Sequence, residues 1–406
     1  MYVQSPENSG GKNNIIMTNK AILSNGRELS IEEGINVLGL MSGTSLDGLD
    51  LCLVNFKFVN GRWQYSIIKA EDEKYPQELH EKLASAQDMN AEEYACLHTG
   101  YGMYLGARVK AFIERNSLEG KVDLVASHGQ TVFHQPKVSF HCDGVPAYGW
   151  TGQIGCGAGI AAVSGVDCVC DFRTTDVAFG GQGAPLVPVG DRNLFTDFDF
   201  CLNIGGFSNI SFDNGSSRSA FDISPVNYVL NHYAGTIGLD YDKDGALARS
   251  GKVCKELFDA LNALDYYNTS GPKSLGREWV EQNIFPLVES YGLELKDAMA
   301  TYTEHAAWQL ARTVKKYSGA IAVKNERMRM LVTGGGAFNK YLVERMAALA
   351  PECEFIVPDA LTVCFKEALI FAFLGALYAF NIPSCLSSVT GARVSNIGGA
   401  LYKAGF

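Results

Sequence analysis

The alternation of apolar and polar residues predicts two strands near the start of the chain, joined by a turn. Residues 35–41 are almost continuously apolar, as in a buried strand, and residues 49–56 alternate, as in a second strand. The segment between them, residues 42–48, is rich in Gly, Ser and Thr, so we expect a hairpin rather than a strand-to-helix crossover. Residues 1–34 precede this change in character, and we expect them to form an N-terminal extension outside the core.

The same pattern of strand, Gly turn and strand recurs in the second half of the chain. Residues 198–204 are apolar, Gly205 and Gly206 open a turn, and residues 210–212 resume the strand. This single matched unit is weak evidence for an internal duplication. Further elements follow from periodicity: helices over 74–118, 253–265, 277–350 and about 365–380, and short strands over 122–127 and 329–333. Alternating strands and helices predict an α/β protein.

Length, charge and cysteine usage exclude several classes of protein. The 406 residues suit two domains, and a net charge of −10 argues against binding to nucleic acid or to an anionic membrane. No positively charged start is followed by an apolar block, so we expect no secretory signal, and the apolar run at 368–380 is short of the ~18 residues of a membrane span. Eleven scattered Cys without a C-x-x-C pair indicate free thiols in a reducing compartment. We therefore expect a cytoplasmic protein.

Three Gly-rich turns at strand ends are candidates for binding phosphate. They are Gly43 to Gly48, Gly205-Gly206 and Gly334 to Gly336. Glycine lets the backbone approach a ligand closely, and successive amides form nests that bind anions. The first turn adds the hydroxyls of Thr44 and Ser45 and the carboxylate of Asp47. Each turn alone is more simply a tight hairpin, but three of them predict a polyphosphate held between two lobes. The chain has neither a P-loop motif nor G-x-G-x-x-G.

Two carboxylates are candidates for phosphoryl-transfer chemistry, which needs a base beside the acceptor and a metal on the phosphates. Asp222 closes a short apolar run before Ser224-Pro225 and could be that base, or simply cap a turn. Glu367 interrupts a strongly apolar helix, where a carboxylate is costly unless it is paired or bound to a metal. Lys366 beside it permits the alternative that both residues lie on a solvated face.

A third group of polar residues follows the apolar run that ends at Cys170. Asp171, Arg173 and Asp176 could form structural ion pairs, or Arg173 could grip the carboxylate of an acidic sugar. His128 could be a general base, and a structural role beside a turn is at least as well supported. Neither G-x-S-x-G nor H-E-x-x-H occurs, which removes support for hydrolases of those types.

The residues from position 36 to 404 resemble, in order, the anhydro-N-acetylmuramic acid kinase family. The first match, Gly39-Leu40-Met41-Ser42-Gly43-Thr44-Ser45-Leu46-Asp47-Gly48, is close to the signature of that family. The resemblance continues through 127–131, 171–173, 180–188, 202–209, 241–246, 271–278, 334–339 and 390–392. Together these motifs are highly specific.

The resemblance implies the two-lobed fold of the sugar kinase, actin and heat-shock ATPase superfamily. Each lobe would be built on a ribonuclease-H-like mixed sheet with helices packed on it, and ATP and Mg²⁺ would bind in the cleft between lobes. We expect the first lobe to comprise residues 35–196 plus about 386–406 and the second to comprise 197–385. The family opens the 1,6-anhydro bridge of anhydro-N-acetylmuramic acid with water and phosphorylates O6, giving N-acetylmuramic acid 6-phosphate and ADP in cell-wall recycling.

The resemblance also assigns roles to residues of this chain. Asp222 matches the catalytic aspartate that activates the water, and Asp222 and Glu367 are the expected metal contacts. The nucleotide-binding residues implied are Gly43, Thr44, Ser45, Leu46, Asp47, Gly48, Leu49, Asp50, Gly205, Gly206, Gly334 and Gly335. We expect the sugar to contact Thr131, Arg173 and Gln182, which lie in matched motifs. The resemblance predicts a small-molecule anhydrosugar as the partner and leaves a homodimer open.

The chain departs from the family pattern in two places. The stretch after the catalytic Asp usually contains two glycines, which are Ser224 and Val226 here. The region 153–157 loses a polar side chain near the expected sugar site, and 142–152 also differs. These changes leave open a kinase of another anhydrosugar, such as levoglucosan, or an inactive nucleotide-binding relative. An actin-like or chaperone-like ATPase explains the motifs at 128–188 and 271–278 poorly.

Overall fold

A computed structural model of the chain forms two compact units. It describes residues 19–23, 26–43, 46, 48–142, 145–215, 217–269, 273–321 and 326–405, with the side chains of 138–142 and 145–147 left aside. The first unit comprises Met1–Leu194 and Phe365–Phe406, and the second comprises Phe195–Cys364. The chain leaves the first unit within two residues of the expected boundary at 196, but it returns at Phe365 instead of near residue 386.

The first unit is built on a six-stranded mixed sheet in the order β15-β9-β6-β3-β4-β5. Its strands are β3 (Ile35–Ser42), β4 (Leu49–Val59), β5 (Arg62–Glu73), β6 (Leu124–Ser127), β9 (Cys168–Cys170) and β15 (Ala400–Tyr402). β3, β4 and β5 form an antiparallel meander, which confirms the predicted first hairpin. β6 and β9 continue the sheet in parallel on the other side of β3, and β15 closes it in the antiparallel sense.

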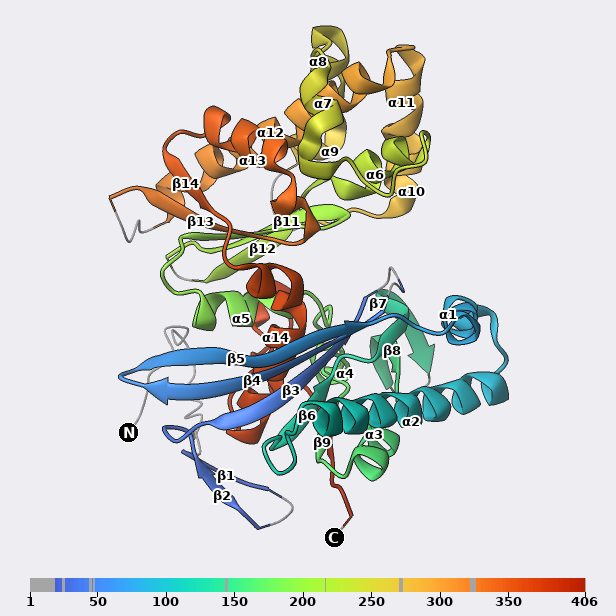
Figure 1. Cartoon of the computed structure of the whole chain (residues 1–406), viewed down its shortest axis with the longest axis vertical. Helices are drawn as coiled ribbons and strands as arrows, with labels where there is room; N and C mark the ends of the chain where they lie inside the picture. Colours follow the sequence, from blue (N-terminus) through green and yellow to red (C-terminus); the bar gives the residue numbers. More distant parts are fainter. Residues whose placement is uncertain are drawn as a thin grey trace. The chain divides into compact units, whose positions relative to one another are not determined.

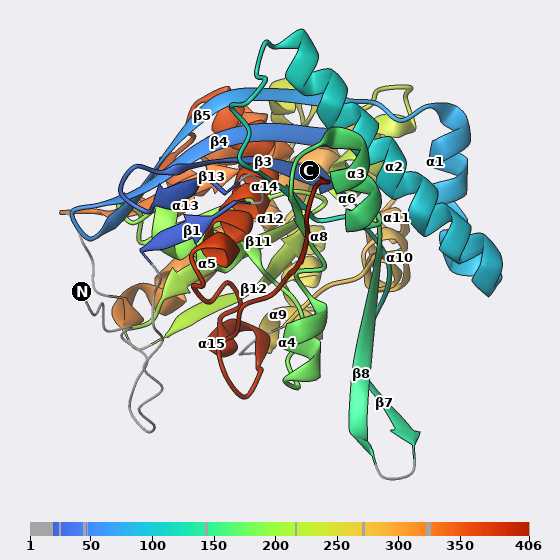
Figure 2. The same cartoon turned by 90° about the horizontal axis from the view of Figure 1, so that it is seen from below.

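Helices cover both faces of this sheet, as the continuous burial of β3 requires. Leu38 and Leu40 point into one core, which they share with α2 (Ala91–Arg115) and α3 (Gly157–Ser164). On the opposite face lies α14 (Ala360–Ala379), whose Phe373 ring is 5.3 Å from that of Phe56 (Figure 2). A methyl group at Gly39 would lie 2.0 Å from the carbonyl oxygen of Ala368, so only glycine lets α14 pack this closely. This packing explains why the chain rejoins the first unit at Phe365.

Smaller elements complete the first unit. The ribbon of β7 (Gln130–Cys142) and β8 (Val145–Ile154) extends away from the six-stranded sheet (Figure 2). The remaining helices are α1 (Gln77–Ala84), α4 (Thr174–Ala178), α5 (Val187–Leu194) and α15 (Ser387–Thr390). Part of the expected extension is folded: β1 (Lys20–Ile22) and β2 (Glu28–Ser30) form a hairpin, and Leu29 and Ile31 are buried. Residues 1–18 of the extension lie outside the described residues.

The second unit repeats the strand order of the first. Its five-stranded sheet, β12-β11-β10-β13-β14, consists of β10 (Phe200–Ile204), β11 (Phe207–Asp213), β12 (Arg218–Pro225), β13 (Met328–Thr333) and β14 (Cys353–Ile356). β10 to β12 form the antiparallel meander, and β13 and β14 follow β10 in parallel, as β6 and β9 follow β3. Two units with one topology support the internal duplication suggested by the sequence, and this topology is the ribonuclease-H-like mixed sheet that the resemblance implied.

Helices supply one continuous core in the second unit (Figure 1). They are α6 (Asn227–Gly235), α7 (Ala246–Ser250), α8 (Lys255–Asn262), α9 (Asp265–Asn268), α10 (Arg277–Asn283), α11 (Phe285–Ser290), α12 (Leu295–Tyr317) and α13 (Lys340–Leu349). The central member is α12, whose buried residues include Tyr302, Ala306 and Leu310. It packs beneath β12, the strand that carries Asp222.

Among the described residues one helix is long and apolar enough to cross a membrane. α14 has a mean hydropathy of 1.9, but 78% of that window is buried inside the protein. Such burial is typical of the core helix of a soluble protein. All ten described cysteines are free thiols, which agrees with the expectation from their spacing.

Candidate functional site

Asp222 is held in a defined orientation near the end of β12, in the second unit. Its backbone N–H donates to the carbonyl of Lys273 (3.0 Å), and its Oδ2 accepts a hydrogen bond from the backbone N–H of Leu275 (2.9 Å). The Tyr266 hydroxyl donates to the carbonyl of Asp222 (2.7 Å). Within the described part of the chain Oδ1 has no hydrogen-bond partner. One carboxylate oxygen is therefore fixed and the other remains available.

The surroundings of Asp222 favour its neutral form more than water does. The side chain is half-buried, and desolvation raises the pKa of Asp222, opposed in part by the hydrogen bond from Leu275. A carboxylate with a raised pKa is a stronger base than an ordinary aspartate. The geometry thus gives Asp222 the properties that a general base needs.

Two of the predicted Gly turns lie side by side in the second unit, because β10 and β13 are parallel neighbours. Gly205 and Gly206 connect β10 to β11, and their carbonyls accept hydrogen bonds from the first N–H groups of α6. Gly334 follows β13 and leads into the short 3₁₀ helix η4 (Gly335–Phe338). Asn227 links the two turns, since its Nδ2 donates to the carbonyl of Ile204 (3.3 Å) and lies 3.6 Å from where a Cβ would stand on Gly335.

The glycines of these turns differ in whether the fold itself requires them. Gly334 has φ +80°, and a Cβ there would lie 2.7 Å from the Ile204 carbonyl oxygen. A Cβ at Gly336 would lie 2.2 Å from Cγ2 of Ile204. By contrast, Cβ atoms at Gly205, Gly206 and Gly335 would meet nothing nearer than 3.6 Å, and none of these three has a positive φ. Space for a ligand is a reason for glycine there that internal packing does not supply.

The first predicted turn is only partly described. Thr44, Ser45 and Asp47 lie outside the described residues. Leu46 has φ 58° and donates its N–H to the carbonyl of Gly43 (3.2 Å). A Cβ on Gly48 would lie 2.5 Å from the backbone oxygen of Glu73, so this glycine serves strand packing.

The two residues that follow this turn begin β4. Leu49 is 1% exposed and belongs to the core of the first unit, so only its backbone could face a ligand. Asp50 is half-buried and pairs with Met41 across the hairpin. All the described residues of the first turn belong to the first unit.

Arg173 makes internal contacts rather than standing free. Its Nη1 donates to the carbonyl of Gly183 (2.7 Å), and its Nη2 lies 2.9 Å from Nε2 of His128. The Nδ1 of His128 is 3.3 Å from the carbonyl of Ser42. Burial and the charge of Arg173 lower the pKa of His128 to about 3, so this histidine is neutral, accepts from Arg173 at Nε2 and donates at Nδ1. This favours the structural interpretation of His128 over that of a general base.

Glu367 and its neighbour Lys366 have different environments on α14. Lys366 is 4% exposed, and its Nζ lies 2.8 Å from Oδ1 of Asp191, so the alternative of a solvated face is wrong for it. Glu367 is exposed to solvent. Desolvation by the surrounding protein raises the pKa of Glu367, while the charges of Lys366 and Arg173 lower it. Glu367 is therefore an accessible carboxylate whose charge two cations of the first unit support.

Asp176 has a structural role, through hydrogen bonds rather than ion pairs. It is fully buried and accepts from the Gly183 N–H (2.8 Å), the Thr390 hydroxyl (2.9 Å) and Asn396 Nδ2 (2.9 Å). The N–H of Gln182 donates to the carbonyl of Thr390 (2.9 Å). Asp176 thus joins the segment containing Gln182 to the C-terminal segment of the chain.

The first unit has a cavity of about 200 Å³ at the carboxyl ends of β6 and β9. Its polar lining comes from His98, His128, Thr151, Gln153, Asp171, Thr174 and Tyr402. Ligands of open α/β sheets bind at such strand ends. The cavity borders two of the matched motifs, but Thr131, Arg173 and Gln182 do not line it. Thr131 is one contact removed, since Gln153 Nε2 lies 3.4 Å from its hydroxyl.

Buried side chains replace the two glycines that usually follow the catalytic Asp. Neither Ser224 nor Val226 has a positive φ, and both are buried. The Ser224 hydroxyl donates to the carbonyl of Pro225 (3.0 Å) and lies 3.2 Å from the Tyr267 hydroxyl. The Ser224 replacement therefore adds a hydroxyl that is hydrogen-bonded within the second unit.

The described His, Cys, Asp and Glu side chains limit the kind of metal site that the protein can form. Across the described ranges no group of three or more His, Cys, Asp or Glu is spaced to hold a metal ion. Mg²⁺ is usually held by one or two carboxylates together with substrate phosphates, and Asp222 and Glu367, each in its own unit, are carboxylates of that kind. Sequence reasoning missed the contacts that orient Asp222, namely Lys273, Leu275 and Tyr266. The matched motif at 271–278 was a signal for Lys273 and Leu275, whereas Tyr266 lies outside it.

Comparison with known proteins gives one family. The family model described as anhydro-N-acetylmuramic acid kinase matches residues 35–404. Proteins named anhydro-N-acetylmuramic acid kinase from Pseudomonas syringae pv. tomato and Shewanella loihica are 34% and 33% identical, over 90% of this chain and 99% and 98% of theirs. One from Cupriavidus pinatubonensis is 34% identical over 91% and 99%.

Likeness to solved structures is weaker. The activator of the 2-hydroxyisocaproyl-CoA dehydratase from Clostridium difficile is 16% identical, with a TM-score of 0.37 over 86% of this chain and 95% of the other. A family model that spans nearly all the chain, with relatives at one-third identity over their whole length, is decisive. The chain belongs to the anhydro-N-acetylmuramic acid kinase family.

Proposed function

We propose that this protein is an ATP-dependent kinase of anhydro-N-acetylmuramic acid that acts in peptidoglycan recycling in the cytoplasm. Water adds to C1, the bond between C1 and O6 breaks, and O6 takes the γ-phosphoryl group, giving N-acetylmuramic acid 6-phosphate and ADP. The observation that carries the proposal is the orientation of Asp222 in a chain of this family. The names of the relatives agree with the substrate.

Asp222 is the proposed base for the attacking water. The N–H of Leu275 holds Oδ2, which leaves Oδ1 free to accept the proton that water loses as its oxygen bonds to C1. The raised pKa of Asp222 strengthens it as a proton acceptor. The contacts from Lys273 and Tyr266 fix the backbone, so the carboxylate does not have to be ordered during the reaction.

The adjacent turns of the second unit are the proposed site for part of the nucleotide. Gly205, Gly206 and Gly335 leave space that no described side chain fills, and their backbone can approach a phosphate closely. ATP supplies the phosphoryl group when bound. Gly334, whose φ is +80°, forms the proposed adenosine turn. The first turn, Gly43 to Asp50, is proposed to contact the phosphates as the resemblance implies.

The first unit supplies the proposed sugar contacts and one of the two proposed metal contacts, Glu367. The cavity of about 200 Å³ is of the size of a monosaccharide, and Thr131, Arg173 and Gln182 lie in the motifs beside it. Because Arg173 already binds Gly183 and His128, we propose that it positions this wall of the site. Glu367 and Asp222 are the carboxylates that would hold Mg²⁺, which neutralises phosphate charge when bound.

Release of ADP by purified protein tests the proposal. Protein with ATP and Mg²⁺ is given anhydro-N-acetylmuramic acid, levoglucosan or no sugar, and the product is identified by its mass. We expect turnover with the muramic sugar alone, and none in Asp222→Asn, which should still bind ATP with near-normal affinity. Turnover with levoglucosan alone would reassign the substrate. Full turnover in Asp222→Asn would end the assignment of the base.

A further inference from the structure

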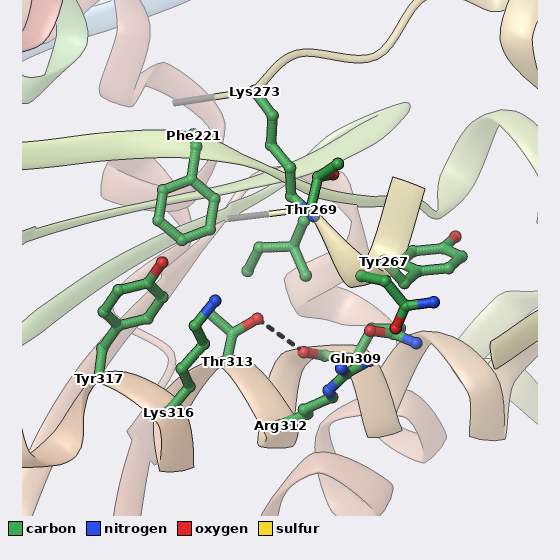
Figure 3. A pocket seen from close by; sticks show the side chains of 11 residues that line it. Phe221, Tyr267, Thr269, Lys273, Gln309, Arg312, Thr313, Lys316 and Tyr317 are labelled. Atoms are coloured by element: carbon green, nitrogen blue, oxygen red, sulfur yellow. Dashed lines mark hydrogen bonds between the residues drawn. The ribbon is translucent and has the colours of Figure 1, made fainter. Parts of the chain in front are cut away.

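A second, smaller cavity lies behind Asp222, within the second unit. It holds about 50 Å³, is open to solvent and is bordered by β12, by the chain that follows α9 and by α12 (Figure 3). Lys273 reaches it from one side, and Arg312 and Lys316 reach it from α12 on the other (Figure 3). None of the functions proposed above uses this cavity.

The charge of the cavity is one-sided. Three cations line it, and no carboxylate does so among the described residues. In a chain with a net charge of −10, such a concentration of positive charge is unusual. Asp222 lies on the same strand but does not line the cavity. The cavity is thus locally positive within an acidic protein.

Lys273 shows the cost of this arrangement. Burial, together with the charges of Lys316 and Arg312, lowers the pKa of Lys273 to about 8. Its Nζ donates to the backbone carbonyl of Tyr266 (2.8 Å) and lies 4.0 Å from the centre of the Tyr266 ring. Neither of these contacts supplies a negative charge. A bound anion would offset the repulsion that Lys316 and Arg312 exert on Lys273.

The volume of the cavity limits which ligands can bind in it. About 50 Å³ accommodates a few waters or one small oxyanion, but neither a sugar ring nor a nucleoside. Three cations from two opposite walls suit a tetrahedral anion, which offers oxygens in several directions, better than a flat carboxylate. Arg and Lys are the residues that most often bind phosphate.

We propose that this cavity binds a phosphate group, either inorganic phosphate or the terminal phosphate of a small monoester, and that binding is transmitted to Asp222. The link is short. Lys273 accepts the N–H of Asp222 through its carbonyl, and Leu275, two residues later, donates to Oδ2. Phosphate that draws the Lys273 ammonium from the Tyr266 carbonyl displaces the segment that orients the base. Transmission, unlike binding, rests on the proposed function.

Binding is tested by calorimetric titration of the full chain at pH 7, below the pKa of Lys273. Inorganic phosphate and glycerol 3-phosphate are the two probes, with chloride at equal ionic strength as the control. The test variant is Arg312→Gln/Lys316→Gln, and the matched control is Lys315→Gln, an exposed cation on the same helix outside the cavity. We expect saturable binding to wild type and to Lys315→Gln, weakened roughly tenfold or more in the double variant.

The outcomes test separately whether phosphate binds in the cavity and whether its binding is transmitted to Asp222. Binding of both probes supports a terminal phosphate as the ligand, and binding of inorganic phosphate alone supports the free ion. No saturable binding, or equal binding by the double variant, overturns the site. In sugar-dependent ADP release, phosphate should lower kcat in wild type and Lys315→Gln but not in the double variant. Equal inhibition of all three overturns transmission. Binding measured without ATP or sugar stays decisive even if the protein does not turn over.

Discussion

Substitution of Gly206 by Ala tests whether glycine is required at this position for folding or for nucleotide binding. A methyl group there would meet Cβ of Tyr228 at 3.7 Å, an ordinary van der Waals contact, and the residue has no positive φ. The chain alone therefore tolerates alanine. If a phosphate approaches this turn as proposed, the same methyl group occupies space that the ligand needs. Gly336, in the neighbouring turn, is the matched control, because a methyl group there would lie 2.2 Å from Cγ2 of Ile204.

The magnitudes follow from these distances. Gly206→Ala should leave the free energy of unfolding unchanged or raise it by about 0.4–1 kcal/mol, because alanine restricts the unfolded chain. Gly336→Ala should lower it by about 1–3 kcal/mol through overpacking against Ile204. Losing one charge-assisted hydrogen bond from the backbone to phosphate costs about 1.5–3 kcal/mol, so ATP should bind Gly206→Ala roughly 10- to 150-fold more weakly.

Two measurements decide the matter. Denaturant unfolding without ligand compares the stability of wild type, Gly206→Ala and Gly336→Ala, and calorimetric titration with ATP and Mg²⁺ compares affinity. The expected result is a stable Gly206→Ala with weak ATP binding and a destabilised Gly336→Ala. Normal ATP affinity in a stable Gly206→Ala would refute the phosphate role of this turn. A loss of stability as large as that of Gly336→Ala would refute the steric argument itself.

Three further predictions rest on buried or perturbed charges. Because desolvation raises the pKa of Asp222 and the base must be ionised, kcat/KM should fall with acid at a pH above the ordinary 3.8; a limb at or below 3.8 in the pH profile would contradict this. Lys366→Met should cost about 3–5 kcal/mol in urea unfolding by stranding buried Asp191, and Lys366→Met/Asp191→Leu should cost less; an equal or larger loss would show that the pair is not coupled. Burial lowers the pKa of His128 and His305 from 6.5 to about 3. As the pH falls below 6.5, only the unfolded state therefore binds a proton at each of these histidines. The free energy of unfolding should then fall by about 1.4 kcal/mol per pH unit for each histidine. His305→Gln should flatten that slope between pH 6.5 and 5, and an unchanged slope would contradict the assignment.

Much of the fold could be predicted because its strands carry strong local signals. The hairpins at 35–56 and 198–212 were visible as apolar runs broken by Gly turns, and both are present. β5 and the β7–β8 ribbon were not predicted, although Trp63, Tyr65 and Ile67 alternate with polar residues along the first half of β5. The return to the first unit was placed too late, because the boundary falls inside α14, a mostly apolar helix with no break in its sequence at Phe365.

Only those parts of the site could be predicted in which a single residue or short motif indicates its function by its type and position. Asp222 and the Gly turns stand at strand ends, where sequence alone points to them. The groups that orient Asp222 come from the distant segment at 266–275, and no periodicity links that segment to β12. The engagement of Arg173 with His128 was likewise hidden, because it depends on how two strand ends meet.

The hairpin that precedes the family's matched region has a practical consequence for how this protein is produced. Arg27 pairs with Asp123 (2.8 Å), whose side chain is only 4% exposed and whose other oxygen accepts the N–H of Asn36. The carbonyl of Ile31 accepts the N–H of Phe58. The family model begins at residue 35. A protein expressed from that residue would lack the β1–β2 hairpin, and buried apolar and acidic side chains near the start of β3, such as Asp123, would become exposed to solvent. Cloning boundaries drawn from an alignment would thus cut into the folded body, and trimming should stop before Asn19.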